Sequence, residues 1–139
     1  MTISKNIIKE TSSVGISGYD QGLGNENHDI VIQENTITSD PDGSTGGIFF
    51  NGISKSTVVK NNIAGNYQLG ILLRDSGGAS KTFSSFNTIS LNTITKTGGG
   101  IMTGIYLESG SSMNLVKNNN FSGVDLPIID QGTLNKIIP

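Results

Sequence analysis

One short pattern recurs five times along the chain and constrains the fold more than any other feature. It consists of an aliphatic residue, two variable positions, Asn, one variable position and then Ile or Phe, with the asparagine at Asn6, Asn35, Asn61, Asn92 and Asn119. A second motif, Gly-Ile, lies between these asparagines at Gly15, Gly47, Gly70 and Gly104, and Pro127 and Ile128 take the fifth place. The strict interleaving of the two series indicates stacked structural repeats.

Each repeat has room for two or three short β-strands and too little chain for a helix. Polar and apolar residues alternate after the Gly-Ile motifs, as in Gly70–Arg74, which is the period of a strand. The 139 residues include 19 Ile but only 2 Ala, and Gly, Ser, Asn and Thr together supply 64. This composition favours strands and turns over helices. We therefore predict an all-β fold, a right-handed parallel β-helix of about five coils, with residues 1–139 as a single domain.

Stacking of the coils predicts two internal columns, because one strand on its own leaves its apolar face uncovered. The first is an inward column of isoleucines: Ile16, Ile48, Ile71, Ile105 and Ile128. The second is an asparagine ladder, with each Asn at a turn in a left-handed backbone conformation and its amide bonded to the Asn of the next coil.

The stretch from Gly104 through Asn114 and Asn119 to Phe121 resembles the parallel β-helix repeat of the pectate-lyase-like superfamily. The resemblance covers roughly residues 1–135. Its relatives include polysaccharide lyases, uronate epimerases, periplasmic copper-accessory β-helix proteins and phage tailspikes. It implies a right-handed parallel β-helix and does not identify an activity, because the matched positions are structural. The pattern begins in mid-repeat at Ile3, so we expect a C-terminal piece of a longer protein.

Two outward columns on the Gly-Ile strands contain the predicted binding residues. The first column consists of Ser17, Phe49, Leu72, Tyr106 and Ile129, and the second of Tyr19, Asn51, Arg74, Glu108 and Gln131. We expect the bulky apolar side chains of the first column to form an exposed strip, which would stack on sugar rings, pack against a second chain or lie under a long loop. The second column places Arg74 beside Glu108 as a cross-strand pair. The predicted substrate-binding residues are Tyr19, Phe49, Asn51, Leu72, Arg74, Tyr106 and Glu108.

Catalytic candidates follow only from the resemblance, because β-helix lyases use a Lys or Arg base, often with calcium, and related glycosidases use a carboxylate pair. The catalytic candidates are Arg74, Asp75 and Glu108, with Lys81, Lys96 and Asp20 as further residues of suitable type. The motifs of alginate epimerases, polygalacturonases and pectate lyases are absent, so we expect that this chain is not a complete enzyme. If it is one, it is a polysaccharide lyase or glycosidase.

Charge and composition limit the cofactors and partners that we expect. The net charge is -2 with one His and no Cys, which disfavours nucleic acid, an anionic membrane and a multi-histidine metal site. We predict no cofactor, with calcium as the one possible ion. The leading hypothesis is a carbohydrate-engaging β-helix of an extracellular or virion protein that binds or degrades a polysaccharide. The alternative is a structural module that forms a homotrimer or an end-to-end stack through its apolar strip.

Overall fold

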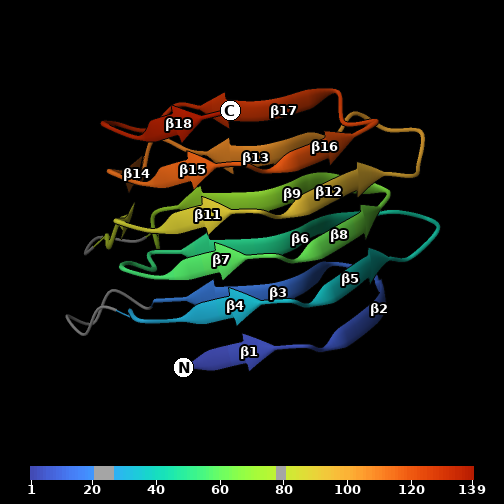
Figure 1. The fold of residues 1–139 in the computed structure, drawn as a ribbon, viewed down its shortest axis with the longest axis horizontal. Coiled ribbons are helices and arrows are strands. Elements are labelled where there is room, and N and C mark those ends of the chain that lie inside the picture. The colour runs from blue at the N-terminus through green and yellow to red at the C-terminus, as the bar shows by residue number, and fades with distance from the viewer. Residues whose placement is uncertain (21–26, 78–80) are drawn as a thin grey trace.

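The computed structural model describes residues 1–20, 27–77 and 81–139, and these residues form an all-β solenoid without a helix. Figure 1 shows the chain winding upward from the N-terminus to the C-terminus, with each coil stacked on the one before. Every pairing between strands is parallel within the described residues. The predicted fold class is therefore confirmed.

Three parallel sheets run the length of the stack. Sheet A contains β1 (Thr2–Ser4), β4 (Val31–Gln33), β7 (Thr57–Val59), β11 (Thr88–Ser90), β15 (Leu115–Lys117) and β18 (Lys136–Ile138). Sheet B contains β2 (Ile7–Thr11), β5 (Thr36–Ser39), β8 (Asn62–Gly65), β12 (Thr93–Lys96) and β16 (Asn120–Ser122). Sheet C contains β3 (Val14–Tyr19), β6 (Ser44–Asn51), β9 (Tyr67–Arg74), β13 (Thr103–Leu107) and β17 (Leu126–Asp130). A small fourth sheet pairs β10 (Ser84–Ser85) with β14 (Ser111–Ser112).

The number of turns is slightly lower than predicted. Five stacked strands in sheets B and C are separated by four steps between coils, so the solenoid advances about four turns, where the sequence suggested about five coils.

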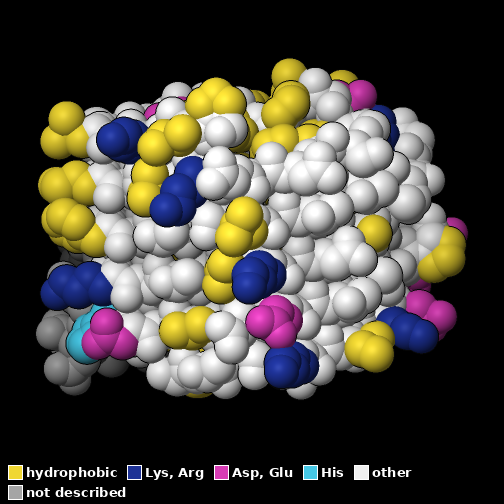
Figure 2. All heavy atoms as spheres, viewed as in Figure 1, with side chains coloured by type: hydrophobic (Ala, Val, Ile, Leu, Met, Phe, Trp, Pro, Cys, Tyr) yellow, Lys and Arg dark blue, Asp and Glu magenta, His cyan; other side chains and the backbone are white. Residues whose placement is uncertain are grey.

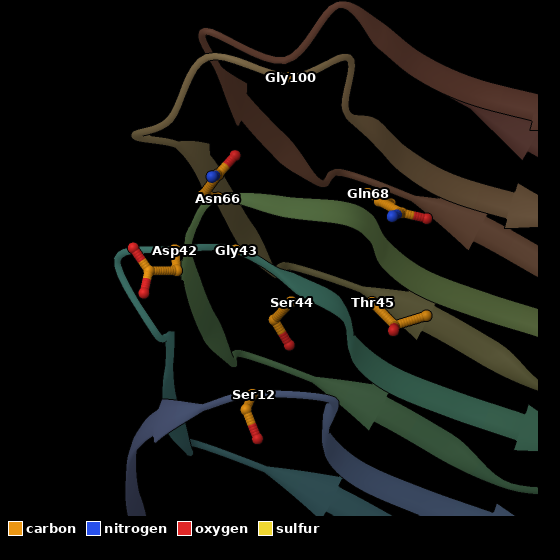
Figure 3. A pocket seen from close by; sticks show the side chains of 8 residues that line it. All are labelled: Ser12, Asp42, Gly43, Ser44, Thr45, Asn66, Gln68 and Gly100. Atoms are coloured by element: carbon orange, nitrogen blue, oxygen red, sulfur yellow. The ribbon is translucent and has the colours of Figure 1, made fainter.

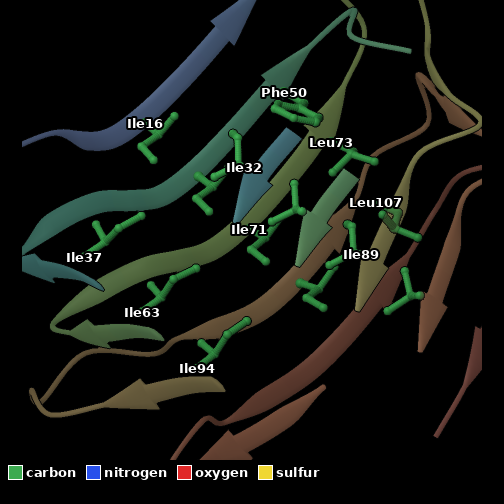
Figure 4. Close-up of a cluster of buried hydrophobic side chains, with 14 of the residues drawn as sticks. Ile16, Ile32, Ile37, Phe50, Ile63, Ile71, Leu73, Ile89, Ile94 and Leu107 are labelled. Atoms are coloured by element: carbon green, nitrogen blue, oxygen red, sulfur yellow. The ribbon is translucent and has the colours of Figure 1, made fainter. Parts of the chain in front are cut away.

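The core is a set of aliphatic columns enclosed by the three sheets, as Figure 4 shows. The predicted isoleucine column of sheet C is confirmed, since Ile16, Ile48, Ile71, Ile105 and Ile128 pair in register. Ile48, Ile71 and Ile105 are fully buried, whereas Ile128 in the last coil is half-buried. Matching columns in the other sheets include Ile32, Val58 and Ile89 of sheet A and Ile37, Ile63 and Ile94 of sheet B.

The predicted asparagine ladder is confirmed at the turn between sheets A and B. The side-chain amide of each asparagine donates to the Oδ1 of the next, at 2.9 Å from Asn35 to Asn61 and 3.0 Å from Asn61 to Asn92. The left-handed conformation was assigned to the wrong position, however. The residue before each ladder asparagine adopts it, for example Lys60 with φ 55 and Leu91 with φ 57.

A second ladder stands at the turn that leads into sheet A. Asn114 Oδ1 accepts from Asn87 N–H at 2.9 Å, and Asn135 Oδ1 accepts from Asn114 N–H and from Asn114 Nδ2. In the coil before Asn87 the place is taken by Ser56, whose N–H donates to Asn87 Oδ1. The two ladders bond one coil to the next at two of the corners of the solenoid.

The glycine of the Gly-Ile motif has a packing role. A Cβ added at Gly47 would lie 2.6 Å from Ile63 Cγ2, and one added at Gly70 would lie 2.9 Å from Ile94 Cγ2. These distances are too short for carbon atoms, so the chain of sheet C approaches the isoleucine column of sheet B only where it has no side chain. This contact explains why Gly precedes the inward Ile in four coils.

Candidate functional site

The polar column predicted at the ends of the sheet C strands is formed. Tyr19 pairs with Asn51, and Asn51 pairs with Arg74, on β3, β6 and β9. Glu108 follows β13, and its N–H donates to Leu73 O at 3.0 Å, which places it one coil above Arg74. Neighbouring coils bring these side chains to within about 5 Å of each other along the axis.

Three residues of this column, Tyr19, Arg74 and Glu108, line a pocket of about 330 Å³. Its lining residues are Tyr19, Arg74, Asp75, Ser76, Gly77 and Glu108. The volume is at the lower end of the range for small-ligand sites in proteins. All three catalytic candidates therefore lie in one pocket together with the exposed ring of Tyr19, which has 53% of its surface accessible.

The guanidinium of Arg74 is held by the buried side-chain amide of Asn51 on the preceding coil. Its Nε donates to Asn51 Oδ1, and Asn51 is 5% exposed and also donates from Nδ2 to Gly18 O at 3.4 Å. Asn51 does not line the pocket. We predicted that Asn51 contacts the ligand directly. In the structure, Asn51 instead orients the guanidinium of Arg74.

The expected pair between Arg74 and Glu108 is not formed. Within the described residues, the ion pairs are Lys5 with Glu34, His28 with Asp29, Lys81 with Asp75, and Lys96 with Asp125. Asp75 is engaged twice, since its Oδ2 lies 3.2 Å from Lys81 Nζ and its Oδ1 accepts from Gly77 N–H at 3.0 Å. Among the described lining residues, Arg74 and Glu108 are charged and form no ion pair, whereas the third charged residue, Asp75, is paired with Lys81.

The prediction of an exposed apolar strip was wrong. The register of the first outward column is as expected, but Phe49 and Leu72 are only 7% and 2% exposed within this one chain. The ring of Phe49 lies over Gly46, where a Cβ would overlap it. Tyr106 is half-buried, and its hydroxyl donates to Gln131 Oε1 at 2.8 Å. Phe49 and Leu72 therefore belong to the packing of the chain, and the assembly alternative loses the surface on which it rested.

The remaining candidates lie outside this pocket or are engaged elsewhere. Asp20 is buried, at 3% exposure, with its N–H donating to Asn51 O at 2.9 Å. Lys96 pairs with Asp125 at 2.7 Å. The segment around Asp40 and Asp42 is a tight turn, with Asp42 N–H donating to Asp40 Oδ1 at 3.0 Å.

Among the described lining residues, Ser76 and Gly77 were not named as candidates from the sequence. They directly follow Arg74 and Asp75, at the point where the chain leaves sheet C. A Gly beside two candidate residues at the end of a strand was the available signal, since such turns commonly complete binding sites on rigid scaffolds.

The fold and the pocket define a parallel β-solenoid with a polar, mixed-charge pocket at the ends of the sheet C strands. A family model described as "NosD: Periplasmic copper-binding protein (NosD)" matches residues 1–135. The chain belongs to this family. No curated protein and no solved structure matches the chain significantly.

The family description corrects two expectations from the sequence. The family is described as copper-binding, so the prediction that no cofactor is involved is contradicted at the level of the family. The family is also described as periplasmic, which agrees with a location outside the cytoplasm and lends no support to a virion.

The described residues of this chain do not fit a copper site. Copper(II) favours imidazole nitrogen, and copper(I) favours thiolate or thioether sulfur. The chain has no Cys, and its one His, His28, is exposed with Nδ1 2.6 Å from Asp29 Oδ2. Met102 is fully buried in the core, and Met113 lies three coils from His28, which is about 14 Å at the usual spacing between strands. Met1 is exposed and stands near His28, since its amino group donates to Asp29 O at 3.1 Å, so one imidazole and one thioether are the most that these residues bring together. Over residues 1–20, 27–77 and 81–139, no group of three or more His, Cys, Asp or Glu side chains is placed to hold a metal ion.

Two further observations concern nucleic acids and membranes as partners. Figure 2 shows Lys and Arg interspersed with Asp and Glu on the viewed face, without a gathered patch of one sign. In the part of the chain that the structure describes, no helix has the length and apolar character needed to cross a membrane.

Proposed function

We propose that this chain is a periplasmic glycan-binding β-solenoid, and that the pocket at Tyr19, Arg74 and Glu108 holds a uronate-bearing sugar unit. The observation that carries the proposal is the combination of a guanidinium and a carboxylate, not paired with each other, beside an exposed aromatic ring in one pocket. The family match supports the periplasmic location.

Each group has a distinct part in recognition. The guanidinium of Arg74 is fixed through Nε by Asn51, so its outer N–H groups are oriented to bind a sugar carboxylate, and such charge-assisted bonds are about twice as strong as neutral ones. Glu108 accepts hydrogen bonds from sugar hydroxyls. The ring of Tyr19 covers the apolar face of the sugar. Burial of roughly 50 Å² of that face contributes about 1 kcal/mol.

The first test is a binding measurement by isothermal titration calorimetry with oligogalacturonate, and with cellohexaose as the uncharged comparison. Arg74→Ala is expected to weaken oligogalacturonate binding by about 10- to 100-fold, since hydrogen bonds to charged groups contribute about 1.5–3 kcal/mol. Tyr19→Ala is expected to weaken it about fivefold. The matched control is Lys9→Ala, which removes an exposed cation on β2.

Equal loss of affinity in Arg74→Ala and Lys9→Ala would show that only net charge matters, and the pocket would then not be the site. Thermal unfolding followed by circular dichroism checks that each variant is folded. The same samples test catalysis, because a uronate lyase raises the ultraviolet absorbance of its substrate. We expect no such rise, with or without calcium, and turnover that Arg74→Ala abolishes would instead make Arg74 the catalytic base.

A further inference from the structure

A second pocket, of about 380 Å³, lies at the opposite end of the sheet C strands, where β6 and β9 begin (Figure 3). Its lining residues are Ser12, Asp42, Gly43, Ser44, Thr45, Asn66, Gln68 and Gly100. Gln68 and Arg74 stand six residues apart on β9, about 20 Å along an extended strand. This pocket is therefore separate from the one at Arg74.

Asn66 stands at the centre of this corner, with a fixed backbone. Its N–H donates to Ser39 Oγ at 2.8 Å, and its carbonyl accepts from Ser44 N–H at 3.1 Å. Gly98 lies against its side chain so closely that a Cβ there would overlap the amide group. Asn66 also lines a neighbouring pocket, together with Ser39 and Gly98 among others. Because Gly98 has no side chain, the amide of Asn66 has room at this position, and Figure 3 shows Asn66 among the side chains that line the cavity.

Several polar groups of the lining make no hydrogen bond to the described residues. These are the amides of Asn66 and Gln68 and the hydroxyl of Thr45, whereas Ser44 Oγ already donates to Ser13 O. Thr45 and Gln68 lie beside each other on neighbouring strands, since Ser44 pairs with Tyr67 and Gly46 pairs with Leu69. Both are exposed, so two adjacent coils present hydrogen-bonding side chains to the same cavity.

The chemistry of this lining indicates the class of ligand. Asp42 supplies the one carboxylate, and no Lys or Arg is among the described lining residues, which disfavours phosphates, sulfates and uronates. Amides and hydroxyls both donate and accept hydrogen bonds, as sugar hydroxyls do. Aromatic and large aliphatic side chains are absent from the described lining, which disfavours an apolar ligand.

We propose that this pocket binds an uncharged pyranose unit of a glycan through the amides of Asn66 and Gln68 and the hydroxyl of Thr45. The inference does not rest on the acidic-glycan site, because the two pockets share no lining residue. It adds a subsite for uncharged sugar units, so that one chain would recognise both neutral and acidic sugars.

The test follows side-chain and backbone amide signals by ¹⁵N-edited NMR during titration with cellohexaose, maltohexaose and laminarihexaose. At about 10 mM sugar, tenfold above a millimolar dissociation constant, we expect the signals of Asn66 and Gln68 to shift with at least one of the three. Gln68→Ala and Asn66→Ala are each expected to weaken that binding about fivefold to tenfold. Neither side chain has a hydrogen-bond partner among the described residues, so both variants are expected to fold.

Arg74→Ala serves as the matched control, and it is expected to leave the binding of the neutral sugar unchanged while it weakens that of oligogalacturonate. Absence of shifts at Asn66 and Gln68 with all three sugars would overturn the inference. So would an equal loss in Gln68→Ala and Arg74→Ala. If the unmodified protein binds a neutral sugar at Asn66 and Gln68 but does not bind oligogalacturonate, the result would support this site and refute the proposed function at Arg74.

Discussion

Removal of a central rung of the asparagine ladder tests what holds the coils together. Asn92 is fully buried. Its Oδ1 accepts from Asn61 N–H at 2.9 Å and from Asn61 Nδ2 at 3.0 Å, and its Nδ2 donates to Val58 O and to Asn119 Oδ1, each at 3.0 Å. The change Asn92→Ala deletes all four hydrogen bonds and adds no bulk.

The expected loss of unfolding free energy depends on which hydrogen bonds the former partners of Asn92 retain. Asn61 Nδ2 retains Ile32 O, at 3.0 Å, but the backbone N–H of Asn61 and the carbonyl of Val58 lose this partner in a dry interior. At about 1 kcal/mol for each net hydrogen bond, with an added cost for the buried N–H of Asn61, Asn92→Ala should lower the free energy of unfolding by about 3–5 kcal/mol.

Asn6, at the first rung of the same ladder, provides the matched control. It is exposed, and its Nδ2 donates to Ser4 O at 3.1 Å and to Asn35 Oδ1 at 2.9 Å. Water replaces these bonds when Asn6→Ala is made, so the expected loss is below about 1 kcal/mol.

Urea unfolding followed by circular dichroism measures both variants, with the slope of the transition compared to confirm that the same cooperative unit unfolds. If Asn92→Ala costs no more than Asn6→Ala, within about 0.5 kcal/mol, the ladder does not stabilise the stack, and the reasoning from buried hydrogen bonds fails.

Three further predictions concern the core, the outward column and an ion pair. Ile71→Ala should cost about 2–5 kcal/mol in urea unfolding, because neighbouring coils prevent collapse around the cavity. A loss below about 1 kcal/mol would argue against tight packing there. Phe49→Ser should cost about 3 kcal/mol or more and leave the mass in sedimentation unchanged, since the ring is buried within the chain; a change of mass without loss of stability would return Phe49 to an interface. The hydrogen bond from Lys96, with a second from Met102 N–H, lowers the pKa of Asp125 from its ordinary value of 3.8. The contribution of Asp125 to stability is therefore present at pH values above 3.8 and lost as the pH falls through its lowered pKa, and Asp125→Asn should flatten the acid dependence of unfolding; an unchanged acid profile would contradict this.

Much of the fold was predictable because a solenoid repeats one geometry. A residue's place in the repeat decides whether it faces the core, so the columns of Ile71 and Asn92 follow from spacing alone. The left-handed conformation was placed one residue too late, since spacing identifies a turn but does not give the backbone angle of each residue in it. The correct position, shown by Lys60 and Leu91, emerges only from the backbone hydrogen bonds of the turn.

The candidate site was predictable only in part. The period of two placed Tyr19, Arg74 and Glu108 in one column, and they do line one pocket. Arg74 bonds to Asn51 and not to Glu108. This outcome depends on side-chain rotamers and on distances of a few tenths of an ångström, which cannot be predicted from the spacing of residues in the sequence.

By itself, the sequence determined the repeat, the parallel stack and its internal columns, because backbone pairing between coils makes the same position recur on every coil. Tertiary structure alone decided how far the outward side chains are exposed and where cavities open. Phe49 is buried because Gly46 leaves space beneath its ring, and the pocket at Asn66 exists because loops that begin at different points of the sequence meet at one corner. Both outcomes depend on the packing of side chains from several coils, and that packing is a property of the assembled solenoid and not of any one repeat.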